Sequence, residues 1–233
     1  MAEDRPQAGR RRGPRPRHTR RQVIDAAVAI ADAESLEAVT IRAVAARLGA
    51  GAMSLYSYVP DKQALVYDMV EQVSGELTVP AAPSGDWRAD LRGLAIEQRA
   101  LLHRHPWLID ALSHRQPLGP GTLDFLEFTL AALEPTGLGA GDILETVALL
   151  NGFVVNLVRA ELADRAAAPD QARADQAAAD AAQARRLGEL LATGRYPRFA
   201  AALAGSGEPR IDLAENFGRL VDRILDGLVR PPG

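Results

Sequence analysis

One segment, residues 40–62 (TIRAVAARLGAGAMSLYSYVPDK), constrains the fold of this chain more than any other. Its first part has apolar residues at the i, i+3, i+4 and i+7 spacing of one helix face, and Thr40 is a suitable N-cap. Gly49 is expected to end this helix, because a tight turn needs a residue that accepts positive φ at little cost. Apolar spacing resumes at Leu55 and continues until Pro60 breaks it. The segment therefore predicts a helix-turn-helix.

Residues in and just after this segment follow an order that is typical of one family of DNA-binding proteins: Thr40, Ile41, Arg42, Ala45, Leu48, Gly49, Leu55, Tyr56, Tyr58, Lys62 and Leu65. In this order the chain resembles the DNA-binding domain of the tetracycline-repressor (TetR) family over residues 20–70, and GAMSLYSYVPDKQAL most resembles its tetracycline-repressor branch. Gly51 and Met53 replace the Ser and Gly of many members. The resemblance implies an all-α fold, in which a three-helix helix-turn-helix domain precedes a helical ligand-binding and dimerisation bundle.

The sequence divides into three regions. Residues 1–18 are rich in Arg, Pro and Gly and are expected to be a disordered basic tail. Residues 19–66, which begin with a capping Thr19, are expected to form the helix-turn-helix domain, and residues 67–233 the ligand-binding and dimerisation domain. Residues 1–62 carry 11 basic and 7 acidic residues, a net charge of +4 against −3 for the whole chain, which suits a phosphate backbone. The tail either follows a groove of the duplex or is a solvated segment that adds non-specific attraction.

The remainder of the chain has helical periodicity, and no alternation of period two is sustained, so no strands are expected. A helix from Lys62 to about Leu77 belongs to both halves of the chain and is the expected mechanical coupler. Residues 167–186 lack large apolar side chains and are expected to form either a polar helix or a mobile loop. Further helices are expected at about 87–104, 106–112, 120–134, 141–166, 183–191, 199–203 and 212–228.

Two helices have more apolar surface than one neighbour can cover. Between residues 143 and 158 apolar side chains go nearly all the way round the helix, which predicts burial on every side. Pairing this helix and the last one with their copies across a two-fold axis would bury the surplus apolar surface. The two DNA-binding domains of such a dimer would lie about 34–36 Å apart. The alternative is a monomeric bundle in which both helices are central. The expected dimer interface contains Leu150, Val154, Val158, Phe217, Leu220, Ile224 and Leu228.

The expected DNA contacts follow from side-chain chemistry. Arg42 has the planar fork that suits guanine O6 and N7. Apolar contacts that suit thymine methyl groups are expected from Ala52, Met53 and Tyr56. Hydroxyl groups that suit phosphates, which position the protein without specifying a sequence, belong to Thr40, Ser54, Ser57 and Tyr58. Lys62, the only lysine, matches a lysine that grips a phosphate in the family; the alternative is a solvated charge.

The resemblance also implies a small-molecule pocket in the helices after residue 84, where a ligand spreads or rigidifies the two reading heads. Aromatic and amide side chains within apolar helices suit a largely apolar pocket with few polar anchors, although each alone also suits plain core packing. The candidates are Gln98, Trp107, Phe125, Phe128, Asn151, Phe153 and Asn156. The His and Glu arrangement that holds magnesium and tetracycline in the name-giving member has no clear match, so that ligand is not expected.

Several other classes of protein are not expected. The chain has no cysteine, and no serine or carboxylate cluster at motif spacing, so no catalytic residue, metal site or cofactor is expected. His103 and His105 are two apart on a helix and are interpreted as surface histidines rather than metal ligands. The glycines at 137, 139 and 141 follow a helix and therefore favour an interhelical turn over a dinucleotide site. No apolar run approaches 18 residues and no signal peptide is recognisable, so a cytoplasmic protein without a membrane span is expected.

These observations predict a dimeric, ligand-responsive transcriptional repressor that binds a palindromic operator in double-stranded DNA and is released by a small-molecule inducer. One alternative is a DNA-binding regulator without a ligand, which is distinguished by whether any small molecule releases it from DNA. A second alternative is a helical small-molecule-binding or enzymatic protein with a vestigial helix-turn-helix. Operator binding at physiological salt would exclude the second alternative.

Overall fold

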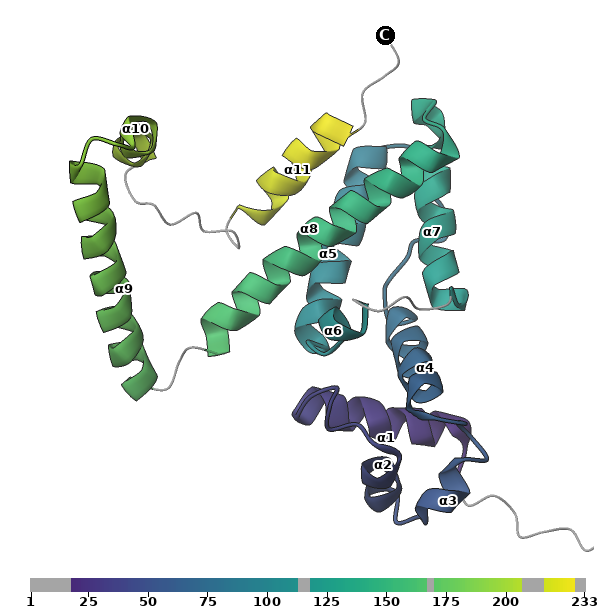
Figure 1. Ribbon diagram of the computed structural model, residues 1–233. Coiled ribbons are helices and arrows are strands. Elements are labelled where there is room, and N and C mark those ends of the chain that lie inside the picture. Colours follow the sequence, from purple (N-terminus) through teal and green to yellow (C-terminus); the bar gives the residue numbers. More distant parts are fainter. Residues whose placement is uncertain (1–17, 113–117, 167–169, 207–215, 229–233) are drawn as a thin grey trace, which may run out of the picture. The chain divides into compact units, whose positions relative to one another are not determined.

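The computed structural model describes residues 18–112, 118–166, 170–206 and 216–228. These residues are helical with connecting turns and contain no strand, which confirms the expected all-α class (Figure 1). The chain forms two compact units, Met1–Met69 (unit 1) and Val70–Gly233 (unit 2), which divide within one helix. The Arg-rich tail and the expected start of the last helix at Asp212 lie outside the described residues.

Unit 1 contains three complete helices and the beginning of a fourth: α1 (Arg20–Ala33), α2 (Ile41–Arg47), α3 (Ala52–Leu55) and α4 (Lys62–Ser74). Thr19 starts α1 with a capping box, in which its hydroxyl accepts from the Gln22 amide at 3.2 Å and its own amide donates to the Gln22 side chain at 2.9 Å. Both nitrogens of the Arg20 fork lie 2.9 Å from the Asp68 carboxylate, so α1 is tied to α4.

The core of unit 1 is made of the apolar faces that the helical spacing predicts. Leu55 and Val59 are fully buried after the turn, as are Leu65 and Met69 on α4. Ala45 is 2 % exposed, and its small side chain lies where α2 contacts α3. Further core residues of unit 1 are Val23, Ala27, Ile30, Ala31, Val39, Ile41 and Val44.

The described part of unit 2 contains the remainder of α4, a short 3-10 helix η1 (Glu134–Thr136), and seven further α-helices: α5 (Trp87–Arg104), α6 (Leu108–Leu112), α7 (Pro120–Leu133), α8 (Ala140–Ala166), α9 (Asp170–Ala192), α10 (Pro197–Ser206) and α11 (Phe217–Leu228). Asp86 caps α5 by accepting from the amides of Arg88 and Ala89 at 3.0 and 3.1 Å. Gly137 has a φ of 74° in the turn before α8, which confirms the interhelical reading of the glycine-rich segment. For residues 167–186 the sequence allowed either a polar helix or a mobile loop. The structure has a helix from Asp170 onward.

Helices α5, α7, α8 and α11 pack into a bundle. Helix α8 crosses α5 and contacts α7, and α11 lies against both α5 and α8 (Figure 1). Two ion pairs, Arg88 to Asp226 and Arg92 to Asp222, join α5 to α11. The pairs are spaced four residues apart in opposite directions along the two helices, as the antiparallel packing of α5 and α11 requires.

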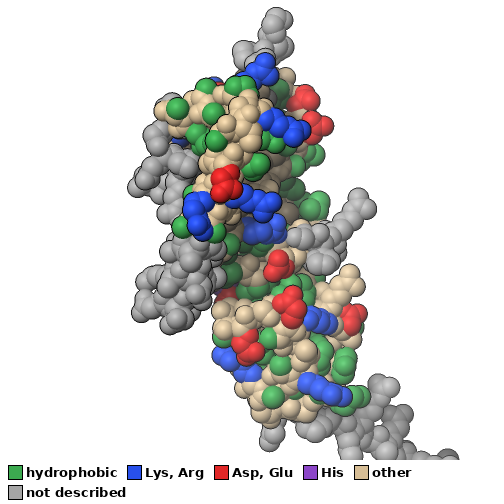
Figure 2. Space-filling model, turned by 60° about the vertical axis from the view of Figure 1, so that its left-hand side comes forward, with side chains coloured by type: hydrophobic (Ala, Val, Ile, Leu, Met, Phe, Trp, Pro, Cys, Tyr) green, Lys and Arg blue, Asp and Glu red, His purple; other side chains and the backbone are tan. Residues whose placement is uncertain are grey.

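Within one chain helix α8 is buried on one side only, so the predicted burial on every side stays a prediction that depends on a second copy. Its buried stripe includes Ile143, Val147, Val154 and Val158, whereas Leu149 is 57 % exposed. On the face shown in Figure 2, basic and acidic side chains are interspersed and apolar atoms reach the surface between them. Helix α8 therefore has one buried apolar face and an outer face on which Leu144 and Leu149 lie among polar and charged residues.

The segment Ala140–Ala163 of α8 is long and apolar enough to cross a membrane by length and composition, so the expectation that no such segment exists is wrong. The core helix of a bundle passes the same test. The contacts of α8 with α5, α7 and α11, and the buried carboxylate of Glu161 near its end, are those of a core helix.

Candidate nucleic-acid interface and ligand pocket

The turn between α2 and α3 has the expected geometry. Gly49 has a φ of 62°, in the left-handed region that favours glycine, and the Ala50 amide donates to the Ala45 carbonyl at 2.9 Å. Helix α3 is shorter than the apolar spacing predicts, because it ends at Leu55 and continues as a turn in which the Tyr58 and Val59 amides donate to the Leu55 carbonyl. Leu55 is the only buried residue of α3, so it anchors the second helix of the motif.

The side chains expected to contact bases lie on the surface of unit 1. Met53 is 81 % exposed and Tyr56 is 49 % exposed, although both are large and apolar or aromatic. Arg42 is exposed at the start of α2, and Ala52 is half-buried at the start of α3. Large exposed side chains such as Met53 and Tyr56 suit a contact with a macromolecule.

The four hydroxyl groups expected to contact phosphates differ in what they already bind. The Thr40 hydroxyl accepts from the Ala43 amide at 3.0 Å and keeps its own proton for a further acceptor. The hydroxyls of Ser54, Ser57 and Tyr58 donate to backbone carbonyls at 2.6, 2.7 and 2.8 Å. Because phosphate oxygens only accept, these three reach a phosphate only if their protons leave those carbonyls. Tyr58 in particular is half-buried and ties the motif to the carbonyl of His18, just before α1.

Lys62 is exposed at the first position of α4, and its ammonium group lies 3.2 Å from the Leu36 carbonyl and 3.4 Å from the Glu37 carbonyl. These contacts hold the loop between α1 and α2 against the start of α4. An ammonium group has three protons, so one remains for a phosphate oxygen. The structure thus gives Lys62 a structural contact that the sequence did not predict, beside its expected role.

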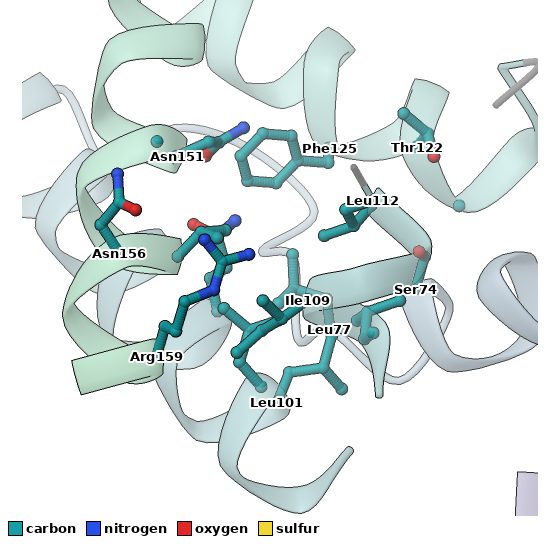
Figure 3. A pocket seen from close by; sticks show the side chains of 16 residues that line it. Ser74, Leu77, Leu101, Ile109, Leu112, Thr122, Phe125, Asn151, Asn156 and Arg159 are labelled. Carbon is teal, nitrogen blue, oxygen red and sulfur yellow. The ribbon is translucent and has the colours of Figure 1, made fainter. Parts of the chain in front are cut away.

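A cavity of about 440 Å³ lies within unit 2, a size that suits a small organic molecule. Four of the predicted residues, Gln98, Phe125, Asn151 and Asn156, line it, and Figure 3 shows the last three around its opening. The remaining lining is mostly aliphatic and comes from α4, the segment after it, α5, α6, α7 and α8. Residues that the sequence did not predict are Ser74, Leu77, Leu101, Leu102, Leu108, Ile109, Leu112, Gly121, Thr122, Gly152, Val155 and Arg159.

Three predicted pocket residues do not line this cavity. Trp107 is buried and meets His105 edge to face, with ring centroids 6.2 Å apart. Phe153 stacks on Phe217, with centroids 6.3 Å apart and ring planes 12° from parallel, and so joins α8 to α11. Phe128 lines a separate hollow beside the linker that follows α4. Their aromatic character reflects packing between helices.

The residues expected at a dimer interface lie largely inside one chain. The side chains of Leu150, Val154, Val158 and Phe217 are at most 5 % exposed within the bundle. Leu220 and Ile224 are half-buried, and the side chain of Leu228 lies outside the described residues. The apolar surface that α8 leaves open belongs instead to Leu144 and Leu149.

The two histidines are not surface residues, so that interpretation is wrong. His105 is 8 % exposed, and its Nε2 lies 3.2 Å from a carboxylate oxygen of Glu76. His103 is half-buried, and its Nε2 lies 2.5 Å from the Glu161 carboxylate. Among the described residues no group of three or more histidine, cysteine or acidic side chains is arranged to hold a metal ion.

Glu161 is the centre of an ion cluster that joins α5 to α8. Its carboxylate accepts from Nε and Nη2 of Arg99 at 2.7–3.1 Å, besides its contact with His103. The Arg99 guanidinium also lies 5.1 Å from the ring centroid of Phe217 on α11. Burial opposes ionisation of Glu161, but the hydrogen bonds and charges of Arg99 and His103 outweigh it and hold the pKa of this carboxyl below its ordinary value of 4.5.

Glu71, near the end of α4, caps the start of α7. Its carboxylate accepts from the Gly121 amide and the Thr122 hydroxyl, both at 3.1 Å. A Cβ at Gly119 would lie 2.1 Å from this carboxylate, so any other residue there would displace the Glu71 side chain from its present position. Since Gly121 and Thr122 line the cavity, the contact that holds α4 to α7 is also part of the cavity wall.

Replacing Glu71 with alanine is expected to lower the free energy of unfolding of unit 2 by about 1–2 kcal/mol, because the first turn of α7 loses its acceptor. Thermal unfolding followed by tryptophan fluorescence measures the loss. The matched control is Glu127→Ala, which removes an exposed carboxylate from α7, the helix that Glu71 caps. This control is expected to change the free energy of unfolding by less than about 0.5 kcal/mol. Equal stabilities of the two variants would show that the cap contributes nothing.

Comparison with known proteins agrees with this architecture over both units. Residues 23–69 match the family model of the bacterial regulatory proteins of the tetR family, and residues 79–230 match that of the tetracyclin repressor-like C-terminal domain. The HTH-type transcriptional repressor DrrR1 of Streptomyces coeruleorubidus is 41 % identical over 223 residues, which cover 94 % of this chain and 81 % of that protein.

Solved structures with the same fold include ActR of Streptomyces coelicolor. Its apo form is 26 % identical, with a TM-score of 0.74 over 93 % of this chain and 97 % of that one. Its complex with actinorhodin is 25 % identical, with a TM-score of 0.73 over 91 % of this chain and 95 % of that one. The match of both units to one family, together with the identity to a repressor over nearly the whole chain, shows that this protein belongs to the TetR family of DNA-binding transcriptional repressors.

Proposed function

We propose that this protein is a homodimeric repressor that binds a palindromic operator in double-stranded DNA and leaves it when a small molecule occupies the cavity of unit 2. The observation that carries the proposal is that α4 belongs to both units. This helix begins with the exposed Lys62 in unit 1 and ends with Ser74, which lines the cavity of unit 2. A ligand that displaces the end of α4 therefore acts on the last helix of the DNA-binding unit.

The solved complex of ActR with actinorhodin supports a ligand in the cavity, because ActR has the same fold over nearly its whole chain. The lining also supports it, since a mostly aliphatic wall with three amide groups gives a few polar anchors in an apolar site. No enzymatic activity and no cofactor belong to this proposal, and the protein acts in the cytoplasm, where its operator is.

The dimer is supported by the apolar surface that one chain leaves uncovered. Leu144 and Leu149 of α8 are 46 % and 57 % exposed, and Leu220 and Ile224 of α11 are half-buried. Pairing α8 and α11 with their copies through these side chains would remove them from water, while Leu150, Val154 and Val158 stay inside each protomer. Two copies of unit 1 would then read two half-sites about one helical turn apart.

The test is selection of duplexes from a random pool by the full-length protein at physiological salt, with the mass of the free protein measured by sedimentation. We expect a dimer and an enriched palindrome. A monomeric protein, or a pool without any enriched palindrome, would contradict the proposal. Release of the selected duplex by small molecules then separates a ligand-responsive repressor from a regulator without a ligand.

Arg42→Ala is expected to cost about 1–3 kcal/mol of binding free energy at one base pair of each half-site, because a bidentate guanine contact is lost. Lys62→Ala is the matched comparison, since it removes one positive charge that we assign to a phosphate. It is expected to weaken binding to all duplexes alike and to reduce the salt dependence by about one phosphate contact. Titration of each variant with the selected duplex and its single-base variants measures both effects. A uniform loss for Arg42→Ala would show that this arginine contacts only the backbone.

A further inference from the structure

We propose that the cavity of unit 2 selects ligands that are largely apolar and carry one negatively charged group, and that Arg159 binds that group. This inference rests on the proposed function, because it names the class of molecule that the ligand-responsive site accepts. A carboxylate, a sulfonate or an ionised phenol would meet the requirement.

Arg159 is the only ionisable side chain that lines the cavity within the described part of the chain. The other polar lining residues, Gln98, Asn151, Asn156, Thr122 and Ser74, are neutral, and none of the described lining residues is acidic. Among the described lining residues the one formal charge is therefore the positive charge of Arg159. A cationic ligand beside Arg159 would be repelled by it, whereas an anionic group would be attracted.

The helical spacing of α8 directs Arg159 to the cavity. Asn151, Val155 and Arg159 are four residues apart and so lie on one face of the helix, which forms one wall. Figure 3 shows the Arg159 side chain extending from α8 toward the space in front of Ile109, with Asn156 on the same helix and Thr122 across the cavity. The guanidinium can thus reach a bound molecule and remain partly hydrated at the opening.

Arg159 also differs from the arginines of α5 that lie in the same bundle. Arg88, Arg92 and Arg99 each have a carboxylate partner, in Asp226, Asp222 and Glu161. No ion pair is formed by Arg159 with any side chain of the described residues. Its charge is therefore available to a ligand, and a bidentate contact to a carboxylate or sulfonate costs no existing salt bridge.

The other place in the wall that attracts anions is already occupied. The start of α7 would favour a negative group, but the Glu71 carboxylate holds the Gly121 amide and the Thr122 hydroxyl there. A ligand anion near Thr122 would be repelled by Glu71, whereas one at Arg159 would be attracted. The two charges orient the ligand, with its acidic group toward α8 and its apolar part toward the aliphatic side chains of α5 and α6.

The test compares two dyes with the same aromatic skeleton that differ by one sulfonate: 1-anilinonaphthalene-8-sulfonate and N-phenyl-1-naphthylamine. Each is titrated into the full-length protein, and the fluorescence gain measures binding. Gly152 lines the cavity, and a Cβ there would meet no atom within 4 Å, so Gly152→Leu is the variant chosen to obstruct the cavity. Only the part of the fluorescence signal that this variant abolishes is attributed to the cavity. We expect the anionic dye to bind about tenfold more tightly than the neutral one.

Arg159→Gln is expected to reduce the affinity for the anionic dye by about tenfold and to leave the affinity for the neutral dye unchanged. Arg159→Lys is expected to reduce the affinity for the anionic dye by about threefold, because lysine keeps the charge but cannot form the bidentate contact. Arg186→Gln removes the same charge from an exposed position of α9 and is the matched control, expected to bind both dyes as the wild type does. The proposal is overturned if the cavity takes no anionic dye, if both dyes bind equally, or if Arg159→Gln and Arg186→Gln behave alike.

Operator binding by the wild-type protein, measured separately, distinguishes the failure of this inference from the failure of the proposed function. If the protein binds a palindrome but shows no preference for the anionic dye, only the assignment of Arg159 fails. If the dye preference is found and no duplex is selected, the cavity has the proposed selectivity and the repressor function fails.

Discussion

Leu55→Ala is expected to destabilise unit 1 by about 2–5 kcal/mol and to abolish DNA binding while unit 2 stays folded. The leucine side chain is fully buried, and it is the only buried residue of the four-residue helix α3. A unit of this size has a total stability on the order of 5 kcal/mol, so the loss removes most or all of it. No neighbouring turn of α3 exists to compensate, because the helix ends at this residue.

The distribution of aromatic residues allows each unit to be followed by itself. The two tryptophans of the chain, Trp87 and Trp107, belong to unit 2, whereas Tyr56, Tyr58 and Tyr67 belong to unit 1. Thermal unfolding of Leu55→Ala is therefore expected to show an early loss of helix by circular dichroism, followed by a tryptophan transition at the wild-type temperature. If the two units unfold separately, as this prediction requires, a single fitted free energy does not describe the protein, so the circular dichroism and fluorescence signals are fitted independently.

Met53→Ala is the control for this variant, since it truncates a side chain of the same helix that is 81 % exposed. It is expected to leave both transitions unchanged within about 0.5 kcal/mol. Coincident shifts of the circular dichroism and tryptophan transitions in Leu55→Ala would contradict the independence of unit 1.

The parts of the fold that were predicted from the sequence depend on contacts between residues near each other in the chain. Thr19, Thr40 and Asp86 cap their helices because each side chain reaches an amide two or three residues ahead. Gly49 marks the turn because its own φ is positive. The helix of residues 87–104 has the predicted bounds for the same reason, since its cap and its apolar spacing are both local.

The parts that were not predicted depend on which helix packs against which face. Apolar spacing on α8 does not distinguish a helix that is covered all round from one whose outer face is open, so the exposure of Leu149 required the structure. His105 is buried because Glu76, 29 positions earlier, supplies its partner, and that pairing leaves no local pattern. Arg159 had a signal, because it lies eight positions, about two helical turns, after the predicted Asn151 and so on the same face of α8. A pocket-lining arginine nevertheless looks like any exposed one until α6 and α7 are placed.

Glu161→Gln is expected to lower the free energy of unfolding of unit 2 by about 3 kcal/mol at neutral pH, the low end of the loss on breaking a buried ion pair. The Glu161 side chain is 8 % exposed, so its loss leaves the Arg99 charge facing a neutral amide in a nearly dry site. The loss stays at the low end because Arg99 is 27 % exposed and regains some water. Chemical denaturation followed by tryptophan fluorescence measures it, and Asp226→Asn, which breaks the exposed pair with Arg88, is the control expected to change little.

Comparison of Glu161→Gln with the wild type also tests how the free energy of unfolding of unit 2 depends on pH. Because the folded state holds the pKa of Glu161 below 4.5, the unfolded chain binds the proton more readily, and the stabilisation is complete only above the unfolded value. The difference in unfolding free energy between wild type and Glu161→Gln should therefore begin to shrink as the pH falls toward 4.5 and vanish below the lowered folded pKa. A difference that grows toward acid pH would mean that the Glu161 carboxyl is held protonated by burial, and that Arg99 and His103 do not outweigh that burial.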